Sequence, residues 1–183
     1  MSNFHENGII ILDFGSQYTQ LIARRIREKH VYSEIMSPDV SLEVIQERSP
    51  KAIILSGGPS SVYEDSSPEY DSKLFAMDIP ILGICYGLQL MAHHYNGQVE
   101  SSSHGEYGFA LINIMNSEHL FHSVSGNTQV WMSHMDRVTQ MPPGWEIMAE
   151  SSNGVVAAMG HVESKRFATQ FHPEGNHTVE GET

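Results

Sequence analysis

The chain has 183 residues, of which 40% are hydrophobic and 17% charged, and 22 acidic residues against 10 lysines and arginines give a formal net charge of −12. This length suits a single globular domain, residues 1–183, with a sizeable core. No apolar run approaches the roughly 18 residues of a membrane helix. The first seven residues lack the basic start and apolar stretch of a signal peptide, so we expect a cytoplasmic protein. The acidic balance argues against nucleic acid and membranes as partners.

The first half of the chain alternates short β-rich runs with helical patterns. In chain order it predicts a strand at 8–13, a helix at 17–29, a strand at 32–36, a helix at 41–48, a strand at 51–56, a helix near 69–77, a strand at 79–84 and a helix at 87–95. Asn96 and Gly97 provide an end signal for the last helix. This alternation is typical of a parallel sheet with helices on both faces.

The second half has a different pattern, with strand-like runs at 109–115, 129–132, 146–151, 155–159 and 166–171 separated by turn residues. These runs predict additional, partly antiparallel strands. The expected fold class is therefore α/β, with an open, mostly parallel twisted sheet. Ligands of such sheets bind at the carboxyl ends of the parallel strands, so the loops after Asp13, Ser56 and Ile84 are the candidate site.

The only cysteine, Cys85, lies at a predicted strand-to-helix junction in the run Gly-Ile-Cys-Tyr-Gly. This spacing matches a nucleophile elbow, in which small neighbours permit a strained turn that lifts the nucleophile out of the sheet. The helix N-terminus is expected to favour the thiolate, because free N–H groups and the helix dipole stabilise negative charge. Taken alone, the motif fits a structural cysteine equally well, so a catalytic interpretation requires a base.

A candidate base follows the last predicted strand, which leads directly into His172-Pro173-Glu174. Residues two apart in an extended chain point the same way, so Glu174 can orient the imidazole of His172. A thiol, an imidazole and a carboxylate in these roles form a cysteine-type triad, in which the base takes the thiol proton and later protonates the leaving amine. We predict that Cys85, His172 and Glu174 are the catalytic residues.

A second glycine-rich loop, Ser-Gly-Gly-Pro-Ser at 56–60, follows the strand predicted at 51–56. Paired glycines let backbone N–H groups approach a ligand closely. The N–H groups of Gly58 and Tyr86 are therefore candidate oxyanion-hole donors, each of a kind worth roughly 3 kcal/mol of barrier. Taken alone, this loop reads as an ordinary turn at the end of a strand.

Three motifs, Gly-Ile-Cys-Tyr-Gly-Leu-Gln, Ser-Gly-Gly-Pro-Ser and Phe-His-Pro-Glu, together resemble the class I (triad-type) glutamine amidotransferases over nearly the whole chain. The resemblance implies hydrolysis of L-glutamine to glutamate and ammonia through a γ-glutamyl thioester on Cys85. It also implies that Gln89, which lies on the same helix face as Cys85, contacts the substrate. Ser133, His134 and Asp136 are implied to hold the amino-acid end of the substrate.

Within this family, the stretches Asp-Phe-Gly-Ser-Gln-Tyr at 13–18, Glu-Tyr-Gly at 106–108 and Val-Trp-Met-Ser-His at 130–134 are similar to the amidotransferase part of bacterial GMP synthases. The similarity implies that the partner is an ATP-pyrophosphatase (synthetase) domain or subunit, which aminates xanthosine monophosphate to GMP. ATP and Mg²⁺ are expected to belong to that partner, whose synthetase and dimerisation regions are absent from these residues. We expect no cofactor or metal in this chain, because the run from Glu118 through His119 to His122 lacks the residue order of a zinc site.

Two residues depart from the family pattern, since Met135 stands where glycine is usual and Gly175 where valine is usual. If position 135 requires positive φ or close approach to glutamine, methionine strains the loop or crowds the pocket. Gly175 is expected to loosen the loop that positions Glu174. Two alternatives therefore stay open, namely a degenerate amidotransferase with a binding or regulatory role in place of catalysis, and a cysteine hydrolase that acts on γ-glutamyl compounds without a partner.

Overall fold

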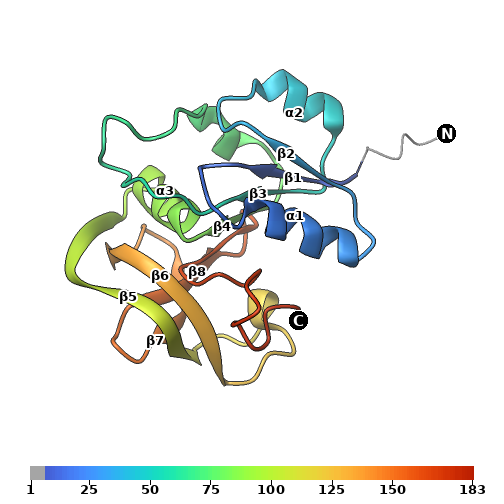
Figure 1. The fold of residues 1–183 in the computed structure, drawn as a ribbon. Helices are drawn as coiled ribbons and strands as arrows, with labels where there is room; N and C mark the ends of the chain where they lie inside the picture. The colour runs from blue at the N-terminus through green and yellow to red at the C-terminus, as the bar shows by residue number, and fades with distance from the viewer. Residues whose placement is uncertain (1–6) are drawn as a thin grey trace.

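The computed structural model describes residues 7–183, which form one mixed sheet of nine strands with helices on both faces (Figure 1). The strand order is β2-β1-β3-β4-β9-β8-β7-β5-β6. The first five are parallel neighbours: β2 (Ser33–Met36), β1 (Ile9–Leu12), β3 (Ala52–Leu55), β4 (Ile81–Ile84) and β9 (Arg166–Thr169). The predicted α/β fold is confirmed.

The second half of the chain adds β5 (Gln98–Ile114), β6 (Asn127–Gln140), β7 (Glu146–Ser151) and β8 (Val156–His161). These strands pair antiparallel with one another, and β8 pairs antiparallel with β9, which joins the two halves. The strand β6 lies at the edge of the sheet. In Figure 1 the β5–β6 ribbon curves away from the parallel strands.

The strands β5 and β6 are much longer than the sequence predicted. They have 17 and 14 residues, whereas the local pattern indicated strands only at 109–115 and 129–132. Residues 101–105, three serines, a histidine and a glycine, have little intrinsic preference for a strand, and of these only Ser101 pairs with β6. Glu106 pairs with His134 and Ser101 with Asp136, so residues 102–105 bulge opposite Met135.

The helices cover the two faces of the parallel strands. On one face lies α1 (Thr19–Glu28), where Ile22 packs in a buried cluster with residues of β1, β3 and β4. On the other lie α2 (Leu42–Arg48) and α3 (Tyr86–His94), and Ile45 of α2 packs there in a larger cluster. Burial on both faces explains why β1 and β3 read as continuous apolar runs.

The helix predicted near 69–77 is wrong, because the structure has only a short 3₁₀ helix at Ser72–Ala76. The carboxylate of Asp71 caps this helix by accepting a hydrogen bond from the Lys73 N–H at 3.0 Å. Met77, at the other end, is already extended. Only five residues therefore lie between Asp71 and Met77, fewer than two turns of an α-helix would need.

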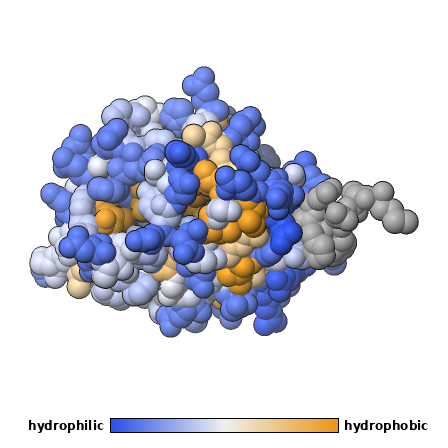
Figure 2. Space-filling view, turned by 90° about the horizontal axis from the view of Figure 1, so that it is seen from above, coloured by the Kyte–Doolittle hydropathy of each residue, from blue (hydrophilic) through white to orange (hydrophobic). Residues whose placement is uncertain are grey.

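Within residues 7–183, no helix combines the length and the apolar character needed to cross a membrane. The face shown in Figure 2 is mostly hydrophilic, with hydrophobic residues gathered near its centre. Single exposed apolar residues are normal on a folded protein, whereas a contiguous row of them indicates an interaction site.

Candidate active site

Cys85 lies between β4 and α3 with φ 54° and ψ −103°, a conformation that is strained for any residue with a Cβ atom. Its glycine neighbours make the turn possible. A Cβ on Gly83 would lie 2.6 Å from the carbonyl carbon of Gly87, and one on Gly87 would lie 2.5 Å from the Leu55 carbonyl oxygen. The Cys85 N–H donates to the Thr169 carbonyl oxygen at 2.8 Å, which ties the strained turn to β9.

His172 and Glu174 follow β9 and form a buried pair. The Nδ1 atom of His172 lies 2.8 Å from Oε1 of Glu174, and the two residues are 4% and 5% exposed. Gly57 lies against both His172 and Cys85, because a Cβ there would be 3.2 Å from His172 Cε1 and 3.4 Å from Cys85 Cβ. The structure therefore brings Cys85, His172 and Glu174 together, with the loop after β3 packed against them.

The surroundings of His172 favour its charged form. Burial opposes the charge, but hydrogen bonds and charge interactions with Cys85 and Glu174 outweigh burial and raise the pKa of His172 to about 10. A positively charged imidazole therefore lies beside the Cys85 side chain. The cysteine sulfur also lies 3.6 Å from the Ser133 carbonyl oxygen and 3.6 Å from Nε2 of Gln170.

A pocket of about 600 Å³ opens in front of Cys85. Its walls come from the loops after β1 and β3, from α3 and from the β5–β6 ribbon. The sequence-predicted residues that line it are Gly58, Cys85, Gln89, Ser133, His134, Asp136 and His172. The ring of Tyr86 is buried against Phe14, with centroids 5.3 Å apart, so any contact of Tyr86 with a ligand is through its backbone.

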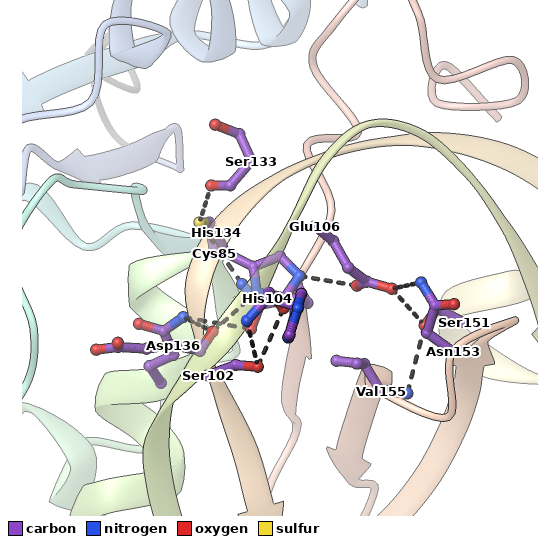
Figure 3. Close-up of polar contacts among 12 residues, drawn as sticks. Cys85, Ser102, His104, Glu106, Ser133, His134, Asp136, Ser151, Asn153 and Val155 are labelled. Carbon is purple, nitrogen blue, oxygen red and sulfur yellow. Dashed lines mark hydrogen bonds and ion pairs between the residues drawn. The ribbon is translucent and has the colours of Figure 1, made fainter.

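His134 takes part in a buried network that sequence reasoning missed (Figure 3). Its Nε2 lies 2.9 Å from Oε2 of Glu106, and its Nδ1 lies 2.8 Å from the Asp136 carbonyl oxygen. The other oxygen of Glu106 accepts hydrogen bonds from Ser151 Oγ at 2.8 Å and from Asn153 Nδ2 at 3.0 Å. Both ring nitrogens of His134 are therefore engaged.

Burial raises the pKa of Glu106, but hydrogen bonds from His134, Ser151 and Asn153 outweigh it and lower that pKa below its usual value. The carboxylate is therefore charged. The sequence placed Glu106 only within a family-like tripeptide, and no local pattern relates it to a histidine 28 residues away.

Gln89 and Gln170 connect this network to Cys85. The side-chain amide of Gln89 donates to the Asp136 carbonyl oxygen at 3.0 Å and to Oε1 of Gln170 at 3.3 Å. Gln170 in turn directs its own Nε2 at the sulfur of Cys85. Gln170 is fully buried and precedes His172 by two residues, a placement that no spacing in the sequence marked as functional.

The two departures from the family pattern lie at different parts of the site. Met135 lines the pocket, is 44% exposed and does not have positive φ, so the strain that a positive φ would cause is absent. A Cβ on Gly175 would meet only the His172 carbonyl oxygen, at 3.5 Å, so there is room for a larger residue. The loop is tied elsewhere, because Thr178 Oγ1 donates to that same carbonyl oxygen at 2.7 Å.

In the part of the chain that the structure describes, no group of three or more histidine, cysteine, aspartate and glutamate side chains is arranged to hold a metal ion. Glu118 and His119 approach to 3.9 Å and are both exposed. His122 is also exposed, so this run of the sequence shows no ligand set.

Comparison with known proteins agrees with the fold. The family "Glutamine amidotransferase class-I" matches residues 10–183. The GMP synthase [glutamine-hydrolyzing] of Campylobacter lari is 50% identical over 175 residues, which are 96% of this chain and 34% of that protein. The GMP synthase [glutamine-hydrolyzing] of Brachyspira hyodysenteriae is 51% identical over 173 residues, 94% of this chain and 34% of that protein.

A solved structure, that of a putative GMP synthase subunit from Thermoplasma acidophilum, superposes with a TM-score of 0.86 at 30% identity, covering 97% of this chain and 89% of that one. The chain spans about a third of the length of the curated relatives that it matches. The family match covers nearly all of the chain. The chain therefore belongs to the class I glutamine amidotransferase family.

Proposed function

We propose that this chain hydrolyses L-glutamine to glutamate and ammonia. The observation that carries the proposal is Cys85 in its strained turn, beside the buried pair of His172 and Glu174, in the wall of a pocket of about 600 Å³. Amide hydrolysis needs a nucleophile, a proton carrier and a group that orients the carrier, and these three residues supply one of each.

In the first half of the proposed reaction, the Cys85 thiolate attacks the side-chain carbonyl carbon of glutamine. The tetrahedral intermediate collapses as the protonated ring of His172 gives its proton to the departing nitrogen, which leaves as ammonia. A γ-glutamyl thioester remains on Cys85. Because Glu174 engages Nδ1 of His172, the other ring nitrogen is left for the thiol and the leaving group.

In the second half, neutral His172 takes a proton from water as the water attacks the thioester carbonyl. Collapse of this intermediate breaks the carbon–sulfur bond, releases glutamate and restores the thiolate beside a protonated His172. No co-reactant other than water is required.

We assign the oxyanion to the N–H groups of Gly58 and Tyr86. Among the residues that the structure describes, no acceptor is found for the Gly58 N–H, and Tyr86 begins α3, where N–H groups lack partners within the helix. Gln89, Ser133, His134 and Asp136 are proposed to form the wall that holds the amino-acid end of glutamine, since all four line the pocket. His134 acts there through its backbone, because both ring nitrogens are engaged.

We propose further that the ammonia serves a synthetase that aminates xanthosine monophosphate to GMP, with ATP and Mg²⁺ bound by that synthetase. Two relatives about half identical to this chain are named GMP synthase [glutamine-hydrolyzing], and the chain matches about a third of each. The synthetase is therefore expected as a further region or as a separate subunit.

The test is to incubate the purified chain with glutamine and to measure glutamate release, with Cys85→Ala as the control. The assay is then repeated with a synthetase from a GMP synthase, ATP and xanthosine monophosphate. Cys85-dependent release that rises with the partner supports the proposal. Absence of release from the folded chain under both conditions overturns it and favours a degenerate subunit, for which Met135 at the pocket wall is the specific cause to examine.

A further inference from the structure

One face of the β5–β6 ribbon carries an exposed row of apolar side chains. On β5, Tyr107, Phe109 and Leu111 alternate with more buried neighbours and are 65%, 61% and 58% exposed. The outward positions of a strand that is buried on one face are normally polar. This row is therefore unlike a simple solvent-facing surface.

Aromatic rings extend the row across β6 to the C-terminal segment. Phe109 lies opposite Trp131, with ring centroids 5.3 Å apart in an edge-to-face arrangement. The ring of His177 lies 4.8 Å from that of Trp131. Val179 is 69% exposed, and its N–H donates to the Gln129 carbonyl oxygen of β6. We call these side chains the aromatic ridge: Tyr107, Phe109, Leu111, Trp131, His177 and Val179.

The aromatic ridge is held in place before any partner arrives. Three of its rings contact one another, and two strands and the C-terminal segment support it. The Trp131 N–H donates to Thr178 Oγ1 at 3.1 Å, which fastens that segment to β6. An apolar surface that is already ordered loses little conformational entropy on binding, so more of the free energy of its burial contributes to affinity.

The ridge reaches the mouth of the active-site pocket. Tyr107 belongs to the ridge and also lines the pocket, and it pairs across the ribbon with Ser133, whose carbonyl oxygen lies 3.6 Å from the Cys85 sulfur. Because Tyr107 is 65% exposed, it stands where the pocket meets solvent. A protein seated on the ridge would border the opening through which ammonia leaves.

We propose that the aromatic ridge is the docking surface for the synthetase. This inference rests on the proposed function, in which ammonia passes to a second active site. Ammonia released into water at neutral pH is protonated to ammonium, which is not a nucleophile, so a partner that covers the opening preserves the reactive form. This chain matches only 34% of the length of the Campylobacter lari relative, so most of that polypeptide is available to supply such a partner.

Other occupants fit less well. A second copy of this chain on the ridge would place two ammonia sources face to face without an acceptor. Nucleic acid is disfavoured by the net charge of −12, and acidic residues lie near both ends of the ridge, Glu64 at the pocket and Glu180 next to Val179. The partner surface is therefore expected to be apolar at its centre and basic at its rim.

The experiment measures binding of the chain to the synthetase region of the Campylobacter lari relative, produced as a separate polypeptide, by calorimetry. The test variant combines Phe109→Ser and Leu111→Ser, two exposed residues that do not line the pocket. The matched control is Met115→Ser, because Met115 is 57% exposed but lies beyond the end of β5. We expect Kd to rise about 10-fold or more in the double variant and less than about 2-fold in the control.

A second readout compares GMP formation fed by glutamine with GMP formation fed by added ammonium. The double variant is expected to lose the glutamine-fed reaction while the ammonium-fed reaction and its own basal glutamine hydrolysis stay unchanged. The inference is overturned if the wild-type chain does not bind, if the double variant binds as the wild type does, or if the substitutions abolish self-association instead. Failure of glutamine hydrolysis by the wild-type chain refutes the proposed function separately, because calorimetry reads binding without catalysis.

Discussion

Two buried histidine–glutamate pairs lie close to the same pocket and are built with nearly the same geometry. In one, Nδ1 of His172 lies 2.8 Å from Glu174, and in the other, Nε2 of His134 lies 2.9 Å from Glu106. The pairs differ in what the second ring nitrogen meets. The ring of His172 lies beside Cys85, which helps to raise its pKa, whereas the second nitrogen of His134 meets the backbone carbonyl oxygen of Asp136.

A carboxylate beside a buried histidine therefore does not identify a catalytic pair. In the proposed reaction the pair of His172 and Glu174 moves a proton, because the ring of His172 lies beside Cys85. Among residues 7–183, the ring of His134 meets only Glu106 and the Asp136 carbonyl oxygen, and these contacts tie the wall from Ser133 to Asp136 to β5. Perturbed titration is common to both, so the partner at the remaining nitrogen distinguishes chemistry from support.

The largest expected effect comes from removing the imidazole that we propose as the proton carrier. His172→Asn is predicted to lower kcat for glutamine hydrolysis by roughly 10⁴-fold, because no group remains to protonate the departing ammonia. The melting temperature, measured on the same preparation, reports whether the fold survives. If His172→Asn kept a tenth of the wild-type rate, the proton carrier would have to be another residue.

Breaking the second pair is predicted to act first on stability. Glu106→Gln leaves His134 without its carboxylate in a buried site and is expected to cost about 3 kcal/mol of unfolding free energy, measured by urea denaturation. Ser151→Ala, which removes one neutral donor to the same carboxylate, is the control and is expected to cost about 1 kcal/mol. Equal losses in the two variants would mean that the charge of the pair contributes nothing. Glu106→Gln is also expected to lower kcat/KM, because the pocket wall from Ser133 to Asp136 is displaced.

The two histidine–glutamate pairs are predicted to lose their contributions to stability at opposite ends of the pH scale. The pKa of His172 is raised from 6.5 to about 10 on folding, so its contribution to stability is complete below pH 6.5 and is lost as pH rises toward 10. The pKa of Glu106 is lowered from 4.5, so its contribution is present above pH 4.5 and is lost as pH falls below that value. The unfolding free energy, measured against pH, should no longer fall at alkaline pH in His172→Asn. In Glu106→Gln it should fall less at acid pH than in the wild type. A variant that changed the opposite limb would contradict these assignments.

The smallest expected effect concerns the pocket wall itself. Met135→Gly is predicted to lower KM for glutamine several-fold by removing a side chain that lines the pocket, and to cost about 1 kcal/mol of stability, because glycine weakens a strand. Met135→Ala separates the two effects, since it shortens the side chain without the added backbone freedom. An unchanged KM in both variants would show that Met135 does not crowd the substrate.

The amino-acid sequence by itself determined the features that depend on neighbours within a few residues. The alternation of runs predicted the parallel half of the sheet, and the glycines around Cys85 predicted its strained turn, because a missing Cβ is a local property. His172 and Glu174 were readable as a pair since they are two residues apart on an extended chain. Local patterns can still mislead. The helix predicted near 69–77 is only a 3₁₀ helix at Ser72–Ala76, because a cap at Asp71 shortened it.

Only the tertiary structure decided the features that depend on strand register. Glu106 and His134 meet because β5 and β6 pair in one register, with residues 102–105 bulged opposite Met135. That register also sets Phe109 against Trp131 and aligns the aromatic ridge with the pocket mouth. Strand partners are chosen by packing over the whole sheet rather than by local preference, so a contact across 28 residues leaves no periodic trace in the sequence.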